Sequence, residues 1–314
     1  MGMIYTLTTN PAIDYHMDLT ETGLMPGQIN RSAREEMYPG GKGINVSVVL
    51  SRLGIKNKAW GFVAGKTGTL LEALASVQGC DCDFILLPEG ETRINVKLDC
   101  EQETAVNGKG PQIQDEQVAD LLNRICRLSA EDTLILSGIL QAGKADLYEE
   151  VARVCDEKGI RMVVDTEGDD LRKTFRYHPF LIKPNREELL KLFNCENDSV
   201  DSIVSMMRAC QNEGVMNVLV TLGGEGALFL SSREKLYKVT INGEHRVIST
   251  VGAGDSTVAG FLAGLELFGD EYGNVLRLAC AAGTATASKK WLCTKEEIEG
   301  VIQDIEVQKC EGKL

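Results

Sequence analysis

The chain has 314 residues, of which 33 are Lys or Arg and 46 are Asp or Glu, so its formal net charge is -13. This acidic balance argues against nucleic acid as a partner, because such binding depends on clustered cations that neutralise phosphates. No apolar run approaches the roughly 20 residues that a membrane span needs, and no secretory leader opens the chain, so we expect a cytoplasmic protein without a membrane partner.

Short apolar runs typical of strands alternate along the chain with helical patterns. The first strand is expected at 3–8. A helix is expected next, because Val46, Val49, Leu50 and Leu53 are spaced at i, i+3, i+4 and i+7, and Gly54 is placed to end it. A second helical pattern covers 118–125. Further strands are expected at 133–136, 162–164, 180–182, 218–222 and 227–230. This order predicts an α/β fold, with a mostly parallel sheet covered by helices on both faces and ligands beyond the carboxyl ends of its strands.

Two segments, at about 13–38 and 91–108, interrupt this alternation. We expect them to form a small β-lid inserted into one domain that spans residues 1–314. Such a lid can fold over a substrate, or it can pair with a second copy of the chain in a homodimer and bury exposed strand edges. The alternative is an ordinary surface excursion.

The run Ser-Thr-Val-Gly-Ala-Gly-Asp-Ser at 249–256 stands at the entrance to an apolar segment of helical length. Gly252 and Gly254 let the backbone turn tightly and bring its N–H groups against an anion, and the helix adds its positive dipole end. Asp255 can then accept the proton of an attacking hydroxyl while the amides hold a transferring phosphoryl group. The alternative is that Asp255 merely caps the helix.

A second glycine-rich loop, Pro-Gly-Gly-Lys-Gly-Ile-Asn at 39–45, precedes the first helical pattern. It is not a Walker A loop, because Gly43 follows the lysine where Ser or Thr is required. Its glycines permit close approach to a polar ligand, Lys42 offers a cation, and Asn45 offers both donor and acceptor groups. Asp14, just after the first strand, is placed to accept hydrogen bonds from sugar hydroxyls, or else is a turn residue. A dehydrogenase is disfavoured because Asn-Pro, and not GxGxxG, follows that strand.

At this separation, the Gly-Gly-x-Gly-x-Asn loop at 40–45 and the Thr-x-Gly-Ala-Gly-Asp run at 250–255 resemble the two signatures of the ribokinase-like sugar kinases, in the branch called minor phosphofructokinases. The resemblance covers nearly the whole chain. It includes Asn-Pro-x-x-Asp at 10–14, Thr-Arg-Ile-Asn-Val-Lys-Leu at 92–98, Ser-Gly at 137–138, Lys-Pro-Asn at 183–185 and Thr-Leu-Gly-x-x-Gly at 221–226. Within this branch the chain looks most like kinases of fructose 1-phosphate and of tagatose 6-phosphate.

This resemblance implies a ribokinase-like three-layer α/β/α fold and a role for each matched residue. Asp255 would be the general base, with an anion hole formed by Gly252, Ala253 and Gly254. The sugar phosphate would be bound by Asp14, Gly41, Lys42, Asn45, Arg93 and Ser137, of which Lys42 and Arg93 would hold its phosphate. The nucleotide would be bordered by Lys183, Asn185, Thr221, Gly223 and Gly226. Glu188 would serve Mg²⁺ through water, although the residues alone favour a solvated helix charge there.

The reaction implied is transfer of a phosphoryl group from ATP, with Mg²⁺, to a ketohexose phosphate. The leading hypothesis is conversion of fructose 1-phosphate to fructose 1,6-bisphosphate, and tagatose 6-phosphate is the rival substrate. One departure bears on the substrate: the branch usually continues Ser-Leu-Pro after 137–138, and this chain has Ile-Leu-Gln at 139–141. A non-catalytic sugar-phosphate sensor on the same fold is the alternative from another class.

Overall fold

A computed structural model describes residues 2–19, 23–99, 104–138, 140 and 146–310. Within these ranges the main sheet has ten strands in the order β14-β13-β12-β11-β10-β9-β8-β1-β4-β5. The strands from β11 to β5 run parallel, and β12, β13 and β14 are added antiparallel at one edge. Their bounds are β1 Ile4–Thr8, β4 Asn57–Val63, β5 Ile85–Leu86, β8 Thr133–Ser137, β9 Arg161–Asp165, β10 Leu181–Ile182, β11 Asn217–Thr221, β12 Ala227–Leu230, β13 Leu236–Ile241 and β14 Ile305–Cys310.

Helices cover both faces of this sheet, and each face has its own apolar core. Successive side chains of a strand point to opposite faces, so Ile135 of β8 packs into one core while Leu134 and Leu136 pack into the other. One core is closed by α1 Lys42–Arg52, α2 Gly65–Val77, α8 Ala253–Phe268, α9 Tyr272–Ala287 and α10 Lys295–Val301. The other is closed by α3 Asp115–Ile125, α4 Leu147–Lys158, α5 Gly168–Arg172, α6 Arg186–Leu192 and α7 Val200–Asn212. Short 3-10 turns lie at Phe175–Tyr177, Gly223–Glu225 and Ile302–Asp304.

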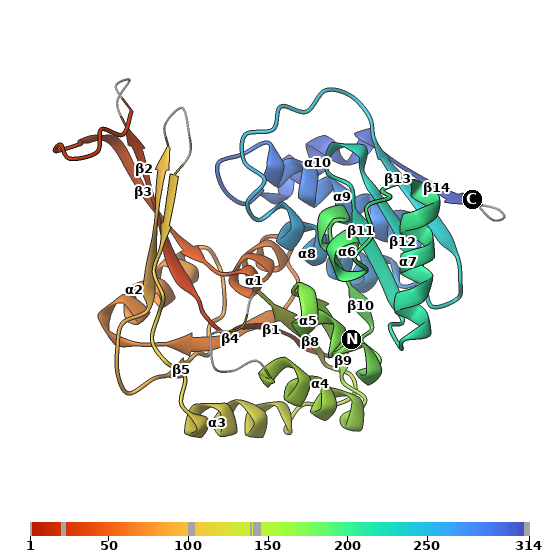
Figure 1. Cartoon of the computed structure of the whole chain (residues 1–314), viewed down its shortest axis with the longest axis horizontal. Coiled ribbons are helices and arrows are strands. Elements are labelled where there is room, and N and C mark those ends of the chain that lie inside the picture. Colours follow the sequence, from red (N-terminus) through yellow and green to blue (C-terminus); the bar gives the residue numbers. More distant parts are fainter. Residues whose placement is uncertain (1, 20–22, 100–103, 139, 141–145, 311–314) are drawn as a thin grey trace.

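A second sheet of four strands, here called the small sheet, stands to one side of this body (Figure 1). Its strands are β2 Ala12–Leu19, β3 Ser32–Gly40, β6 Arg93–Asp99 and β7 Thr104–Asn107, in the order β3-β2-β6-β7. The strand β2 pairs parallel with β6 and antiparallel with β3. These strands come from the two segments that the sequence sets apart, and β2 begins only four residues after β1 ends.

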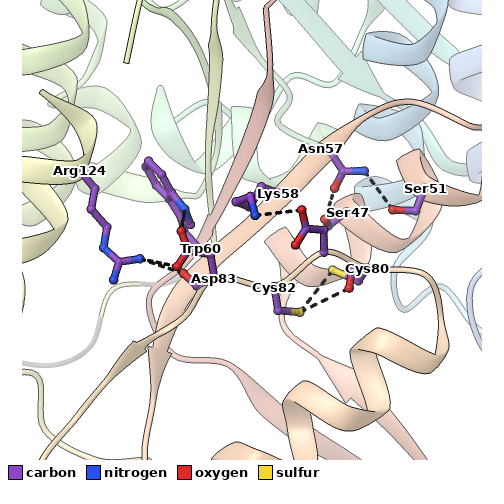
Figure 2. A network of polar contacts seen from close by, with 10 residues as sticks. Ser47, Ser51, Asn57, Lys58, Trp60, Cys80, Cys82, Asp83 and Arg124 are labelled. Atoms are coloured by element: carbon purple, nitrogen blue, oxygen red, sulfur yellow. Dashed lines mark hydrogen bonds and ion pairs between the residues drawn. The ribbon is translucent and has the colours of Figure 1, made fainter. Parts of the chain in front are cut away.

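Polar contacts join α1, β4 and α3 near one edge of the main sheet (Figure 2). Ser47 of α1 donates a hydrogen bond to the amide oxygen of Asn57 at the start of β4, and the Asn57 amide donates to Ser51 Oγ at 3.0 Å. Further along, Trp60 Nε1 and Arg124 Nη1 both donate to the Asp83 carboxylate, at 3.1 and 2.9 Å. Because buried polar groups are costly unless paired, the hydrogen bonds between Ser47, Ser51 and Asn57 hold α1 against β4, and α1 carries two predicted site residues.

The predicted α/β fold with a mostly parallel sheet is confirmed, and the differences are local. The first helix begins at Lys42, earlier than its apolar spacing indicates, because the glycine-rich loop itself turns into the helix at Gly41. The strands β4, β5, β13 and β14 of the main sheet had no counterpart among the predicted elements. Among the described residues, no helix combines the length and apolarity required to cross a membrane.

Candidate active site

A cleft of about 1350 Å³ opens at the carboxyl ends of the parallel strands. Its walls include residues at or just after the carboxyl ends of β1, β8, β9, β10 and β11, together with the first turns of α1 and α8 and the near end of the small sheet. Loops at this edge of a parallel sheet are where α/β proteins place their ligands. The cleft therefore joins the segments in which the sequence predicted chemistry.

Asp255 lies in the first turn of α8, at the floor of the cleft. The helix begins after Gly252, whose φ of 78° is left-handed and suits glycine. The Asp255 side chain is only 5% exposed and accepts a hydrogen bond of 2.7 Å from the Asn45 amide. Burial, followed by repulsion from Asp165, raises the pKa of Asp255 to about 6, although Lys42, Asn45 and Lys183 act in the opposite direction. A carboxylate with this pKa is ionised at neutral pH and is still a useful base.

Asp165, the last residue of β9, brings two lysines together beneath Asp255. The Nζ atoms of Lys183 and Lys42 lie 3.3 and 3.6 Å from Asp165 Oδ1. The Asp165 side chain is 1% exposed, and neither carboxylate oxygen has a hydrogen-bond partner among the described residues. Burial lowers the pKa of Lys42, but the nearby carboxylates outweigh this effect and the pKa ends above its ordinary value. Two ammonium groups are thus held where they can neutralise a phosphoryl group.

Gly254, in the first turn of α8, lies against Lys183, one of these two lysines. A Cβ atom at this position would lie 3.0 Å from Lys183 Nζ and 3.4 Å from its Cε. A side chain here would make the end of Lys183 shift by a few tenths of an ångström, so the close approach of the lysine favours glycine. The first turn of α8 also carries N–H groups that the helix itself cannot satisfy, and these make it an anion-binding end.

The small sheet supplies the opposite wall of the cleft. Asp14 of β2 lies directly across from Asn95 of β6, and the Asn95 amide donates to its carboxylate at 2.8 Å. Arg93 donates to the Asn10 carbonyl through Nε at 3.1 Å and Nη2 at 2.9 Å, and to the Gly108 carbonyl through Nη1 at 3.4 Å. Burial lowers the pKa of Arg93, and Asp14 partly offsets this. Arg93 therefore spans two loops as well as lining the cleft.

The end of the cleft away from the small sheet is built by β10, β11 and the start of α6. Asn185 and Glu188 form a capping box: the Asn185 side chain accepts from the Glu188 amide, and the Glu188 side chain accepts from the Asn185 amide, both at 2.8 Å. Thr221 donates its amide to the Pro184 carbonyl at 3.2 Å, which joins the two loops. Glu188 is partly exposed and lines the cleft, so its carboxylate both caps a helix and faces the site.

All of the site residues that the sequence predicts line this one cleft, including Ser137 at the end of β8. Residues 139 and 141 of the Ile-Leu-Gln departure lie outside the described residues; Leu140 between them is buried. Sequence reasoning missed Asp165 and Asn95. Asp165 had a usable signal, since it directly follows the strand predicted at 162–164, at the edge where ligands bind. Asn95 had a weaker one, its place two residues after Arg93 on the same strand.

Comparison with known proteins identifies the family. Residues 7–298 match the pfkB family of carbohydrate kinases, which is most of the chain. The chain belongs to the pfkB family. As a member it is a sugar kinase, with ATP as the substrate that supplies the phosphoryl group. The predicted resemblance to the ribokinase-like sugar kinases is confirmed.

Individual relatives of this pfkB chain act on sugar phosphates. It is 37% identical over 308 residues to the 1-phosphofructokinase of Bacillus subtilis, covering 97% of this chain and 99% of that one. It is 33% identical over 307 residues to the D-tagatose-1-phosphate kinase of Bacillus licheniformis, with 97% and 99% covered. The crystal structure of Escherichia coli phosphofructokinase-2 with fructose-6-phosphate is similar at a TM-score of 0.87 and 26% identity, with 96% and 99% covered.

Proposed function

We propose that this chain phosphorylates fructose 1-phosphate on its free primary hydroxyl and forms fructose 1,6-bisphosphate. The observation that carries the proposal is the buried Asp255 in the first turn of α8, hydrogen-bonded to Asn45 and faced by two lysines. Two relatives are named as kinases of ketohexose 1-phosphates, which supports a substrate with its phosphate on carbon 1.

In this mechanism Asp255 removes the proton of the acceptor hydroxyl as that oxygen attacks the γ-phosphorus of ATP. Asn45 donates to one Asp255 oxygen at 2.7 Å and so orients the carboxylate. The amides of 252–255 hold the equatorial phosphoryl oxygens, and Lys42 and Lys183 offset the charge that the phosphates bring into the cleft. Positioning and charge neutralisation supply most of the rate in such a transfer.

The small sheet and the loop at 40–45 hold the sugar phosphate. Asp14 accepts from sugar hydroxyls with its orientation set by Asn95, and Gly41, Asn45 and Ser137 line the same part of the cleft. Arg93 uses one N–H from each of its three nitrogens on backbone carbonyls. Because a guanidinium has five N–H donors, two remain for the substrate's own phosphate. The sequence also assigned Lys42 to that phosphate, but Lys42 lies with Asp165 near Asp255 and so serves the transferring phosphoryl group instead.

The nucleotide end is formed by Lys183, Asn185, Thr221, Gly223 and Gly226. The described residues contain no group of three or more metal-binding side chains. This fits Mg²⁺, which is usually held by one or two carboxylates together with substrate phosphates and water. Asp165, whose two oxygens have no hydrogen-bond partner, and Glu188 are the carboxylates in reach of that end. When bound, the ion would neutralise phosphate charge.

The test is ADP release with Mg²⁺ and ATP, measured in parallel on fructose 1-phosphate, tagatose 1-phosphate, tagatose 6-phosphate and fructose 6-phosphate. We expect the highest kcat/KM with fructose 1-phosphate. A higher value with either tagatose phosphate would keep the mechanism and replace the substrate. Sugar-phosphate binding without turnover of any of the four would support the sensor and refute the kinase proposal.

We further propose that two copies pair through the small sheet. Along the strands of the small sheet, residues that face the cleft alternate with residues on the opposite, outer face of the sheet. This outer face carries Met37, Ile94 and Val106, which are 44%, 40% and 61% exposed. Apolar side chains gathered on one exposed sheet face are typical of an interface. Sedimentation should show a dimer that Val106→Asp weakens; a wild-type monomer at micromolar concentration would refute this.

A further inference from the structure

The loop between α9 and α10 contacts both walls of the cleft through four consecutive residues, Lys290 to Cys293. Two of them touch the small sheet and two touch the segment that leads to Asp255. None of these four residues lines the cleft, so lining the cleft gives them no role in the reaction.

The first two residues hold the small sheet. Lys290 Nζ lies 2.8 and 2.9 Å from the two carboxylate oxygens of Asp18 on β2. The Trp291 ring stacks on Tyr38 of β3, with ring centroids 4.7 Å apart and planes inclined by 18°. The Arg52 guanidinium at the end of α1 also lies over this ring, 4.9 Å from its centroid. Trp291 thus joins α1 of the main body to the small sheet.

These contacts reach the strand face that carries the sugar site. Tyr38 is paired directly with Asp14 in the sheet register. Side chains of directly paired residues share a face, as do side chains two or four positions apart on one strand. Asp14, Asp18 and Tyr38 therefore point to the same side. Displacing Tyr38 or Asp18 from the loop would move Asp14 relative to the main body.

The next two residues hold the catalytic end. Leu292 is 5% exposed and lies so close to the start of α8 that a Cβ at Gly252 would be 2.7 Å from its Cδ2. The Cys293 amide donates a hydrogen bond of 3.1 Å to Thr286 Oγ1. Thr286 Oγ1 in turn lies 2.7 Å from the hydroxyl of Ser256, the residue that follows Asp255 in the chain. Arg52 Nη1 fixes the same backbone by donating to the carbonyls of Leu292 and Cys293, at 2.7 and 2.9 Å.

We propose that Lys290 and Trp291 are positioning residues, which set the distance between the sugar site on the small sheet and Asp255 at the start of α8. This inference rests on the proposed kinase function. It predicts that loosening either contact harms use of the sugar phosphate and spares ATP, because the nucleotide end is built by β10, β11 and α6 and does not depend on the small sheet.

The experiment compares Lys290→Met and Trp291→Leu with Lys289→Met, a matched control whose ammonium group pairs with Glu297 of α10 and not with the small sheet. We expect kcat/KM for fructose 1-phosphate to fall about fivefold in Lys290→Met, as suits a partly exposed ion pair, and about 30-fold in Trp291→Leu. The KM for ATP should stay within about twofold in all three variants, and Lys289→Met should match wild type.

A charge reversal separates positioning from general loss of packing. The double variant Asp18→Lys with Lys290→Asp restores the ion pair in the opposite sense, and it should recover at least half of the activity that Lys290→Met loses. The inference alone would be overturned by equal activity in the three variants Lys290→Met, Trp291→Leu and Lys289→Met. It would also be overturned if the KM for fructose 1-phosphate and the KM for ATP rose equally. Absence of wild-type turnover with every ketohexose phosphate would overturn the proposed function, and this inference with it.

Discussion

Replacing the proposed base with its uncharged isostere should make the protein more stable and nearly inactive. Asp255→Asn keeps the shape of the side chain and an oxygen that can accept from Asn45, so the 2.7 Å hydrogen bond can persist. What the change removes is a charge that burial disfavours. The stabilisation is therefore a direct measure of how strongly the site opposes ionisation of Asp255.

The magnitude follows from the raised pKa of Asp255. The folded chain binds this proton more tightly than the unfolded chain, so the group stabilises the fold at low pH, and that contribution is lost as pH rises from 3.8 to about 6. The pKa difference of about 2, at 1.36 kcal/mol for each pH unit, amounts to about 3 kcal/mol at pH 7. Asp255→Asn should gain stability of this order at pH 7 and about half as much at pH 5.

Urea unfolding of both proteins at pH 7 and pH 5 measures this difference, and other titrating groups cancel in the comparison. A matched control is Asp201→Asn, because Asp201 also lies in the first turn of a helix, α7, but is exposed. That change should cost roughly 0.5 kcal/mol, the usual loss of an acidic side chain from a helix N-terminus. The kcat of Asp255→Asn should fall by about 10² to 10⁴. No gain in stability at pH 7, or a gain that does not shrink at pH 5, would refute the reasoning.

Three further outcomes are expected. In wild type, kcat/KM for the sugar phosphate should fall tenfold for each pH unit below about 6, and a flat profile down to pH 5 would remove Asp255 as the base. Gly254→Ala should displace Lys183, whose Nζ would lie 3.0 Å from the new Cβ, and lower kcat about 10- to 100-fold with little change in melting temperature. The control is Gly273→Ala in α9, where a new Cβ would meet no atom within 4 Å, and equal kcat in the two variants would contradict this role of Gly254. Arg93→Ala should raise KM for fructose 1-phosphate at least about tenfold and affect unphosphorylated fructose much less; an equal loss for both sugars would argue against a phosphate contact.

Local sequence patterns were sufficient for the chemistry carried by single segments. The run at 249–256 specifies its own conformation, since glycine permits the left-handed turn at Gly252 and the apolar residues that follow can only be buried as a helix. Short apolar runs located five of the parallel strands, β1, β8, β9, β10 and β11, and the cleft opens at their carboxyl ends. In these cases the information lies within about ten residues, because local backbone preference and burial favour the same structure.

Tertiary structure alone decided which distant side chains meet. Asn45 and Asp255 are 210 residues apart and yet share a hydrogen bond, and Asp165 gathers two lysines that no spacing relates. The raised pKa of Asp255 likewise depends on burial and on a second carboxylate, Asp165, at the end of β9. The strands β13 and β14 and the contacts of Lys290 and Trp291 with the small sheet were also absent from any local pattern. The physical reason is that these features arise from packing between elements, which a sequence specifies only through the whole fold.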